Sequence, residues 1–324
     1  MVDQFGRKID YLRISVTDRC NLRCVYCMPE SGIQSLPHNE IMTFEEIIRV
    51  VKVGSAFGIS KIKITGGEPL VRKNLIFLIR KIKEVRGIHQ VTMTTNGVLF
   101  DKYGVQLVEA GLDGVNFSLD CLDASTFLHI TRVDAYSEVL DAIKLSCKLG
   151  LKTKINCVPI QEINSAALSE LAGLAKYYPV HVRFIELMPI GLGEKFTFID
   201  NQHVLKVLVQ QYGNPQQAVR GLGNGPARYY NFPGFQGSIG FISAVTEEFC
   251  DNCNRIRLTA EGRLKLCLHF NEGIDLKTLL REGISDEQLG ETLQSAIFQK
   301  PRHHNFHCRT NGVVETRKMV QIGG

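Results

Sequence analysis

Short apolar segments rich in Ile and Val alternate with segments of helical period from the start of the chain to about residue 212. This alternation is typical of a parallel sheet whose strands are joined by helices. It predicts an α/β fold, an incomplete (βα)6 TIM-like barrel, with a doubly wound open sheet as the alternative. The expected strands are Tyr11–Val16, Lys61–Thr65, Val91–Thr94, Gly114–Leu119, Lys152–Val158 and His181–Leu187. The expected helices are Phe44–Phe57, Leu75–Val85, Lys102–Ala110, Ser137–Leu149 and Ala166–Tyr177, several of them ending at a glycine.

The alternation breaks after about residue 212, where Gly, Pro and aromatic residues become frequent from Pro215 to Gly240. We therefore expect a barrel over residues 1–230 and a smaller α+β extension over residues 231–324. No apolar run approaches the ~18 residues that a membrane span needs. The first residues, Met1 to Gln4, do not resemble a secretory signal, and we expect a cytoplasmic protein with no membrane partner.

The net charge of +5 is mild. A zinc-binding nucleic-acid protein is one alternative class, but its basic residues would follow an exposed helix, whereas here many lie within apolar strands. We therefore expect no nucleic-acid partner. An enzyme with an anionic substrate fits this charge if the basic residues converge on one site.

Three cysteines form a C-x3-C-x2-C loop just after the first expected strand: Cys20, Cys24 and Cys27. Three soft ligands at this spacing favour an iron–sulfur cluster in which one of the four irons stays open. The alternatives are half of a zinc site and a disulfide cluster. Zinc usually takes four ligands in C-x2-C pairs, and disulfides are rare in the cytoplasm.

A second group of three consists of Cys250, Cys253 and Cys267. Its C-x2-C pair is the usual zinc spacing, so a zinc site completed by His269 is a serious alternative here. Basic residues crowd the segment between these thiols, which favours a second open cluster beside an anionic ligand. For the remaining four cysteines we expect buried free thiols: Cys121, Cys147, Cys157 and Cys308.

Basic residues interrupt the apolar strands, where a charge is costly unless it meets a partner or a ligand. If the strands belong to a covered barrel, alternate side chains face its interior, and the basic ones predict an anion such as a triphosphate there. Exposure on one open face of the sheet is the alternative. The residues concerned are Arg13, Lys61, Lys63, Lys154 and Arg183.

Polar and glycine-rich turns follow the expected strands, at the carboxyl ends where parallel sheets bind their ligands. Gly66, Gly67, Glu68 and Pro69 form one such turn, in which bare backbone can approach a cofactor and Glu68 can accept from an ammonium group. The other positions are the first cysteine loop, Thr95 to Gly97, Ser118 to Asp120, Asn156, and Glu186 to Met188, and we expect all of them at one rim.

Cys20-x3-Cys24-x2-Cys27 with Tyr26, together with the Gly66–Pro69 turn, resembles the radical S-adenosylmethionine superfamily. The flanking residues Arg19 to Pro29, the segment Cys250-x2-Cys253-x-Arg255-x-Arg257 with Cys267, and the terminal Gly323-Gly324 resemble one family within it, the GTP 3′,8-cyclases. This resemblance extends over almost the whole chain. One departure is Lys63, where the family usually has arginine; lysine keeps the charge but loses the two-pronged donor geometry.

The resemblance implies two [4Fe–4S] clusters, held by Cys20, Cys24 and Cys27 and by Cys250, Cys253 and Cys267. S-adenosylmethionine would be bound by Tyr26, Gly67, Glu68, Asn96, Ser118 and Met188. GTP would be bound by Arg13, Lys61, Lys63, Thr94, Lys154, Arg183, Arg255, Ile256 and Arg257, of which Lys154 and Arg257 are also the expected catalytic residues. Relatives present the Gly-Gly end as a tail that reaches the active site; an unstructured end is the alternative.

The implied reaction is that of a lyase in molybdenum cofactor biosynthesis. A 5′-deoxyadenosyl radical removes hydrogen from C3′ of GTP, the C3′ radical attacks C8 of guanine, and one-electron reduction with protonation gives 3′,8-cyclo-7,8-dihydro-GTP. We expect a barrel holding both clusters at one rim, an external one-electron reductant, a homodimer, and transfer of the product to cyclic pyranopterin monophosphate synthase. A peptide-modifying radical maturase remains an alternative, although about seven C-terminal cysteines are expected there and the second cysteine group of this chain has three.

Overall fold

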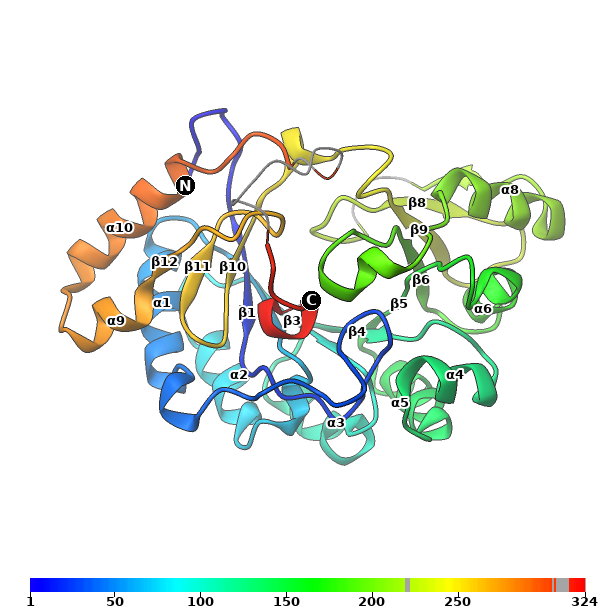
Figure 1. Ribbon diagram of the computed structural model, residues 1–324, viewed down its shortest axis with the longest axis horizontal. Coiled ribbons are helices and arrows are strands. Elements are labelled where there is room, and N and C mark those ends of the chain that lie inside the picture. Colours follow the sequence, from blue (N-terminus) through cyan, green and yellow to red (C-terminus); the bar gives the residue numbers. More distant parts are fainter. Residues whose placement is uncertain (219–221, 305, 307–314, 324) are drawn as a thin grey trace.

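The computed structural model describes residues 1–218, 222–304, 306 and 315–323. Its strands form one sheet in the order β12-β11-β10-β1-β2-β3-β4-β5-β6-β9-β8-β7. The sheet curves around the centre of the molecule and helices cover its outside (Figure 1). The strands are β1 Tyr11–Ser15, β2 Lys61–Thr65, β3 Gln90–Thr95, β4 Gly114–Ser118, β5 Lys152–Cys157, β6 His181–Ile185, β7 Gln216–Gln217, β8 Arg228–Asn231, β9 Ser238–Ile242, β10 Arg255–Leu258, β11 Arg263–Lys265 and β12 Ile274–Asp275.

The helices lie between and beyond these strands. They are α1 Phe44–Ala56, α2 Leu75–Lys83, α3 Phe100–Glu109, α4 Ala124–Thr131, α5 Tyr136–Lys148, α6 Leu168–Ala172, α7 Leu174–Tyr177, α8 Asn201–Tyr212, α9 Leu276–Arg281, α10 Asp286–Phe298 and α11 Met319–Ile322. In the described part of the chain no helix is long and apolar enough to cross a membrane.

The six expected strands are confirmed and lie side by side in chain order, all parallel. A doubly wound sheet reverses its strand order at a switch point. Here the order from β1 to β6 never reverses, so the barrel-like alternative is the one that the chain adopts. Gly58, Gly87, Gly111 and Gly150 end their helices with positive φ angles, as the sequence predicts.

The expected helix over Ala166–Tyr177 is interrupted. A 3-10 turn at Ser165–Ala167 precedes α6, and Gly173 separates α6 from α7. Besides the C-terminal helices α9, α10 and α11, two helices of the described chain were not among those expected, α4 and α8. Each begins at an aspartate whose side chain accepts from the first turn, Asp123 in α4 and Asp200 in α8. These caps are the signals that locate both helices in the sequence.

The C-terminal part of the chain extends the barrel at both edges. β9 pairs in parallel with β6, and β10 pairs in parallel with β1. Eight neighbouring strands of the described chain therefore run parallel, two more than the sequence predicts. Because strands on both sides of residue 230 share this sheet, the boundary expected there stays a prediction.

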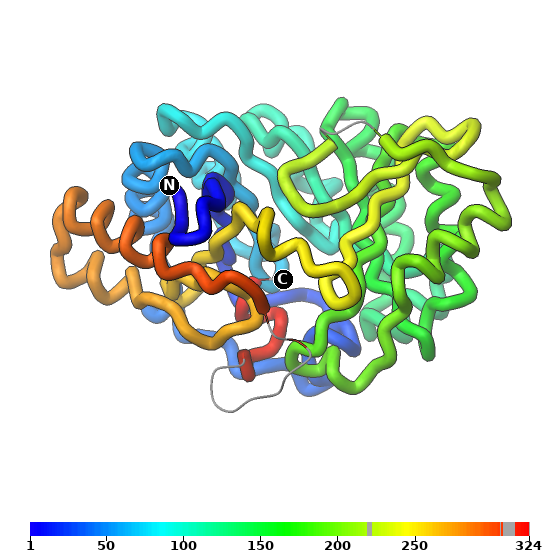
Figure 2. Tube along the Cα trace, turned by 90° about the horizontal axis from the view of Figure 1, so that it is seen from above, coloured from blue at the N-terminus to red at the C-terminus, as the bar shows by residue number. Residues whose placement is uncertain are grey.

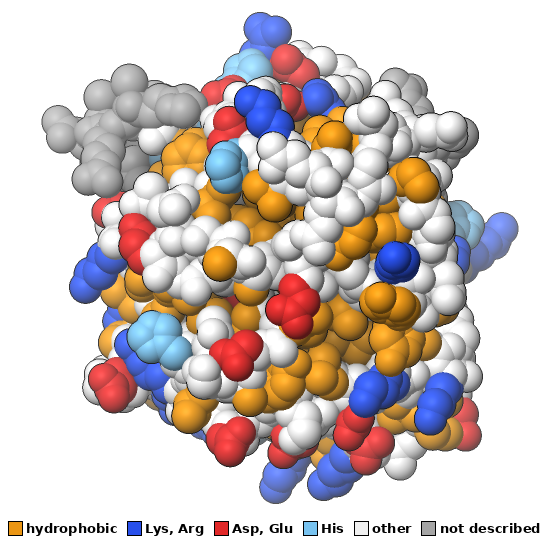
Figure 3. All heavy atoms as spheres, turned by 90° about the vertical axis from the view of Figure 1, so that its right-hand side faces the viewer, with side chains coloured by type: hydrophobic (Ala, Val, Ile, Leu, Met, Phe, Trp, Pro, Cys, Tyr) orange, Lys and Arg blue, Asp and Glu red, His pale blue; other side chains and the backbone are white. Residues whose placement is uncertain are grey.

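Alternate strand residues face two different environments. The outward-facing set packs with the helices in one hydrophobic core that includes Leu12, Ile62, Val115, Ile155 and Ile256. The inward-facing set is largely polar and surrounds the cavity described below. On the side of the molecule that carries α6 and α8, hydrophobic side chains reach the surface, and the Lys and Arg side chains there stand beside Asp and Glu (Figure 3).

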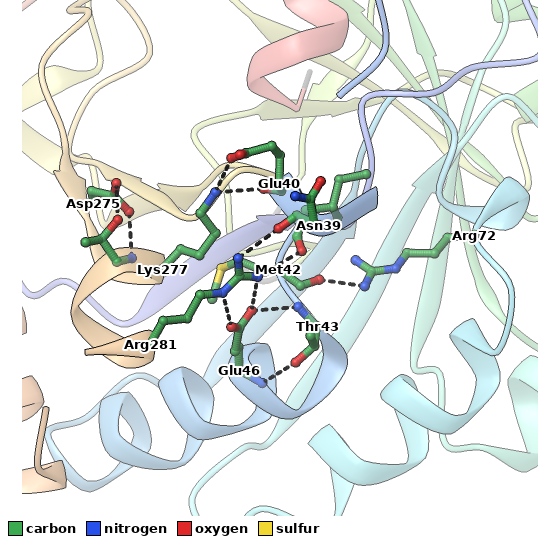
Figure 4. Close-up of polar contacts among 11 residues, drawn as sticks. Asn39, Glu40, Met42, Thr43, Glu46, Arg72, Asp275, Lys277 and Arg281 are labelled. Atoms are coloured by element: carbon green, nitrogen blue, oxygen red, sulfur yellow. Dashed lines mark hydrogen bonds and ion pairs between the residues drawn. The ribbon is translucent and has the colours of Figure 1, made fainter. Parts of the chain in front are cut away.

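Polar contacts attach the C-terminal extension to the barrel. Lys277 bonds both the carbonyl and the carboxylate of Glu40, and Arg281 bonds Glu46 and the carbonyl of Asn39 (Figure 4). Glu46 also closes the capping box of α1 with Thr43. α9 is thus held against the start of α1 through side chains from both.

Candidate active site

The first cysteine triad lies on the loop that follows β1. Cys27 and Met28 both donate backbone N–H groups to the carbonyl of Cys24, which makes a tight turn. The loop also bonds the end of α4, through Arg23 to Thr131 and Val25 to Ile130, at 2.9 Å each. Short local bonds and one neighbouring helix therefore fix the position of all three thiols.

The Gly66–Gly67 turn packs against the backbone that leads into this loop. A Cβ atom on Gly67 would lie 2.4 Å from the carbonyl oxygen of Arg19, and the Gly67 N–H donates to Thr17 at 2.7 Å. No side chain fits in this space. The close approach that requires glycine is thus to residues 17–19 of the chain itself, one position before Cys20.

Glu68 is buried and serves the neighbouring turn. Its carboxylate accepts from Thr95 Oγ1 and the Asn96 N–H, at 2.7 Å each, and from the Leu70 N–H at 3.0 Å. Burial raises the pKa of Glu68 to about 7 despite these bonds. Glu68 is absent from the cavity wall, and its predicted contact with an ammonium group stays a prediction.

Tyr26 reaches across the barrel from the cysteine loop. Its hydroxyl donates to Asp120 Oδ2 at 2.7 Å, and Asp120 Oδ1 accepts from the Val158 N–H at 2.8 Å. Asp120 follows β4 and Val158 follows β5. These two hydrogen bonds connect the cysteine loop to the ends of β4 and β5 and hold the Tyr26 side chain at the cavity.

The first triad suits a cluster better than a single ion. In tetrahedral zinc sites Zn–S bonds of ≈ 2.3 Å place the sulfurs about 3.8 Å apart. Among the described residues, neither triad forms a group of ligand atoms that all lie within 4.8 Å of one another. Burial raises the pKa of Cys20 to about 11 and of Cys27 to about 12, so the thiolates need a bound cation, and an iron–sulfur cluster fits this donor set.

The second triad lies at the opposite end of the barrel, so the expectation that both clusters share one rim is wrong. Cys20 to Cys27 follow the carboxyl end of β1, whereas Cys250 and Cys253 precede β10. β10 is parallel to β1, with Arg255 opposite Tyr11, the first residue of that strand. The cysteines before β10 therefore stand at the amino ends of the strands.

Cations surround the second triad. Burial alone would raise the pKa of Cys253, but Arg255 and Lys300 lower it to about 6. Arg255 also stacks on the ring of Phe249, with its guanidinium carbon 4.8 Å from the ring centre. His269, the candidate fourth zinc ligand, lines the cavity but forms no single-ion group with the triad. One group with single-ion spacing joins Cys250 to the exposed Glu248 and His303.

One cavity of ≈ 570 Å³ connects the two triads. The predicted site residues that line it are Arg13, Cys20, Cys24, Tyr26, Cys27, Lys63, Gly67, Thr94, Asn96, Ser118, Lys154, Arg183, Met188, Cys250, Cys253, Arg255, Arg257 and Cys267. Three predicted residues do not line it. Besides Glu68, Lys61 pairs with Asp10 at 2.9 Å, and Ile256 packs in the hydrophobic core.

Basic residues line the cavity between the triads. Arg257, Arg13 and Lys63 stand directly opposite one another on three neighbouring strands, which are about 4.8 Å apart. On the other side Asn156 accepts from Arg183 Nε at 2.9 Å. The Asn116 amide, with its oxygen turned to the cations, accepts from Lys63 at 2.7 Å and Arg183 at 2.8 Å.

The cavity disfavours the charged forms of these basic side chains. Burial, and then Arg183, lowers the pKa of Lys154 to about 7, which disfavours its charged form by about 5 kcal/mol. Burial and neighbouring cations also lower the pKa of Lys63 and Arg257 well below their ordinary values. The carboxylates on the cavity wall, Asp120 and Glu186, are engaged with backbone N–H groups. The arrangement therefore favours a polyanionic ligand.

The C-terminal tail enters the cavity from outside the barrel. α11 places Met319 and Val320 on its wall, and the Gly323 carbonyl accepts from Arg257 Nη1 at 2.8 Å. Gly323 has a positive φ, and a Cβ atom there would lie 2.7 Å from that of Ser15. The end of the described chain lies over the middle of the sheet (Figure 1). Gly324 lies outside the described residues.

Several cavity residues were missed by the sequence reasoning. Asn116 follows the same every-second-residue pattern as the basic side chains, which was the signal available for it, whereas Asn156 was expected at the rim. Lys300 and Met319 carry no such signal, because they reach the cavity from segments outside the sheet. Among the other expected free thiols, Cys121 and Cys157 are buried and Cys147 is partly exposed. Cys308 lies outside the described residues.

Two protein-family models match the chain. The model of the radical SAM superfamily matches residues 14–175, and that of Molybdenum Cofactor Synthesis C matches residues 180–306. Curated relatives named GTP 3′,8-cyclase align over the full length of both chains. The relative from Desulforamulus reducens is 48% identical over 328 residues, and that from Syntrophomonas wolfei is 46% identical over 331 residues.

A solved structure with a related fold is that of Streptococcus suis SuiB bound to S-adenosylmethionine. It aligns with a TM-score of 0.61 over 97% of this chain and 77% of SuiB, at 16% sequence identity. At this identity the likeness supports the shared radical SAM fold. The likeness gives no evidence that this chain binds a peptide of the kind with which SuiB has also been crystallised.

Proposed function

This chain belongs to the GTP 3′,8-cyclase family of radical S-adenosylmethionine enzymes, and from that premise we propose how its residues divide the work. The reaction converts GTP to 3′,8-cyclo-7,8-dihydro-GTP, a step of molybdenum cofactor biosynthesis. The observation that carries the proposal is one cavity that joins two cysteine triads through a wall of basic side chains from several strands.

At the first triad we infer a [4Fe–4S] cluster on Cys20, Cys24 and Cys27, with S-adenosylmethionine beside it. Asn96 supports this assignment, because its amide lies within 3.8 Å of Cys20 Sγ at the cavity wall. Tyr26 is held by Asp120 where it can pack on a flat ring. Gly67, Ser118 and Met188 complete this part of the wall.

The basic residues of the strands would hold the triphosphate. Arg13, Lys63, Lys154 and Arg183 converge from four strands, and a triphosphate replaces their mutual repulsion by charge-assisted hydrogen bonds. Thr94 adds a hydroxyl on the same face of β3. Lys61 is the weakest member of the predicted set, because it is already paired with Asp10 at the edge of the barrel.

At the second triad we infer another [4Fe–4S] cluster, which Cys250, Cys253 and Cys267 would hold and beside which the guanine base would bind. Arg255 and Arg257 come from β10 between this triad and the phosphate site, and Ile256 would contribute its backbone alone. The lowered pKa of Cys253 supports a thiolate there. The wide spacing of the triad supports a cluster over zinc.

The bound first cluster and S-adenosylmethionine supply the radical that removes the C3′ hydrogen. The chain's own part is to orient and enclose the nucleotide. Cations that fix the phosphates use binding energy remote from the reacting carbon to hold the ribose in position. Arg257 stands nearest the tail and would stabilise charge on the guanine, while Lys154 anchors a phosphate.

Membership of the family also supports three partners and one cellular compartment, which we include in the proposal. They are an external one-electron reductant, cyclic pyranopterin monophosphate synthase as the recipient of the product, a homodimer, and the cytoplasm as the compartment. Each follows from membership of the family and none from a contact described above.

Anaerobic incubation with S-adenosylmethionine, dithionite and GTP tests the proposed function. Mass spectrometry is expected to find 5′-deoxyadenosine, methionine and the cyclic nucleotide in equal amounts. Abundant 5′-deoxyadenosine with intact GTP would contradict the proposal and would favour a peptide-modifying enzyme of the same fold.

A further inference from the structure

Arg7 is a buried arginine outside the cavity whose donors are all in use. Its side chain is 5% exposed, and its Nε donates to Asp3 Oδ2 at 2.6 Å. Nη1 donates to the carbonyls of Cys250 at 2.7 Å and Arg302 at 2.8 Å. Nη2 donates to the carbonyls of Pro301 at 2.7 Å and Lys300 at 3.4 Å. Five donors thus meet five acceptors.

These acceptors belong to segments that are far apart in sequence and meet at the second cysteine triad. Cys250 belongs to the triad itself, and Lys300 is a buried base whose charge acts on Cys253 and Cys267. The first residues of the chain lie beside the segment that follows α10 (Figure 2). The Gln4 N–H also donates to the carbonyl of Phe298, at 3.2 Å.

Asp3 fixes the orientation of this guanidinium. Its side chain is fully buried, and Oδ1 accepts from the backbone N–H groups of Phe5 at 3.0 Å and Arg7 at 2.9 Å. The pair therefore forms a rigid unit in which the charge of Arg7 is neutralised and its fork points at the carbonyls. Neither Asp3 nor Arg7 lines the cavity, but Arg7 binds the carbonyls of two residues that do, Cys250 and Lys300.

We propose that the Asp3–Arg7 pair, termed here the amino-terminal clamp, is the positioning element of the second cluster. It joins the Cys250 loop to residues 300–302, so that the three thiols and the Lys300 ammonium converge on one site. The inference rests on the proposed second cluster. The residues that precede β1 would thus act in assembly of the second cysteine site, and Arg7 would not contact GTP.

The first triad needs no such clamp, because one continuous loop carries it. The clamp therefore predicts a selective defect. Replacing Arg7 by Gln removes most donors to the four carbonyls, and the second cluster is expected to be lost while the first is kept. Iron after anaerobic reconstitution should fall from about eight to about four atoms per chain. Formation of 5′-deoxyadenosine without GTP should stay within about twofold.

Arg281→Gln is the control. Arg281 also joins the C-terminal extension to the barrel, through Glu46 and two backbone carbonyls, but at α9 and not at the triad (Figure 4). It is more exposed than Arg7, so its loss tests attachment of the extension as such. This variant is expected to keep about eight irons.

Arg7→Lys is expected to have an effect on the KM for GTP that general destabilisation of the fold would not produce. Lysine keeps the charge beside Asp3 but cannot serve four carbonyls in a fork. We expect it to retain part of the second cluster and to raise the KM for GTP at least about tenfold with the KM for S-adenosylmethionine unchanged.

Each outcome has a defined meaning. About eight irons and an unchanged KM for GTP in Arg7→Gln would overturn the clamp and leave the proposed function intact. Equal loss of iron in Arg7→Gln and Arg281→Gln would also overturn it, because the role would then be structural. About four irons in the unaltered protein would overturn the second cluster, and the clamp with it.

Discussion

The two ends of the barrel hold their cysteines by different means. At the carboxyl ends of the strands, eight consecutive residues carry all three thiols, and backbone turns fix them. At the amino ends, Cys250 and Cys253 lie on one loop and Cys267 on another. Residues from the beginning and the end of the chain bind those loops. One site is built locally, and the other depends on contacts between distant segments.

The electrostatics of the two ends also differ. Burial raises the pKa of Cys20, Cys24 and Cys27 and also that of Cys250 at the second end, whereas Arg255 and Lys300 bring the pKa of Cys253 there down to about 6. The first end thus favours its thiolates only with a metal cluster bound. The second end carries positive charge of its own and suits an anionic ligand. The difference matches a radical-generating end and a substrate-binding end.

Replacing a thiol at the first end should have the largest effect. Cys24→Ser is expected to reduce formation of 5′-deoxyadenosine to background, because a site with two ligands does not hold the open cluster. Product chromatography after anaerobic incubation measures this. Cys147→Ser, a partly exposed thiol on α5, is the matched control and should retain full activity. Normal cleavage of S-adenosylmethionine in Cys24→Ser would refute the assignment of the first end.

Replacing a thiol at the second end should separate the two activities. Cys253→Ser is expected to keep the first cluster and the cleavage of S-adenosylmethionine without GTP, and to lose cyclisation. Iron analysis should give about four atoms per chain. If zinc were found in the unaltered protein with about four irons, the second end would be a zinc site and the comparison between two clusters would fail.

The cations between the ends should give intermediate effects. Lys63→Met removes one charge-assisted contact to the triphosphate and should weaken GTP binding about 10- to 100-fold, for a loss of about 1.5–3 kcal/mol. Lys61→Met should change it less than about threefold, because Lys61 is paired with Asp10 outside the cavity. Anaerobic calorimetry measures both. Equal effects of the two substitutions on the affinity for GTP would show that Lys61 also binds GTP.

The smallest effect should be a dependence on pH. The pKa of Lys154 is about 7 in the empty cavity, and a bound triphosphate raises it. The favourable charge is therefore fully present below pH 7 and is lost as pH rises above that value. Between pH 6 and pH 8 the GTP affinity should fall about tenfold more in the unaltered protein than in Lys154→Met. Calorimetry at both pH values tests this, and parallel profiles would show that Lys154 does not bind phosphate.

Much of the barrel could be predicted because its signals are local. Runs such as Lys61–Thr65 have an apolar alternate face, and glycines such as Gly58 mark the ends of the helices that precede them. The first triad was equally visible, since its spacing alone defines it. The basic residues were placed correctly wherever they share the inward face of a strand, as Arg13 and Lys63 do.

The rest depends on contacts between distant segments. Ser238–Ile242 and Arg255–Leu258 are short, and no local pattern shows that they pair in parallel with β6 and β1. Without that pairing, the second triad was expected at the wrong end. Lys61 faces the predicted side but stands where Asp10 can reach it. The four carbonyls bound by Arg7 lie 243 or more residues away in sequence, beyond the reach of spacing rules.

We propose that GTP lies between the two ends with its ribose toward the first. GTP deuterated at C3′ tests it most directly, through mass spectrometry of the 5′-deoxyadenosine that forms in an anaerobic reaction. One deuterium is expected to pass from C3′ to 5′-deoxyadenosine. Unlabelled 5′-deoxyadenosine formed together with the cyclic nucleotide would contradict it.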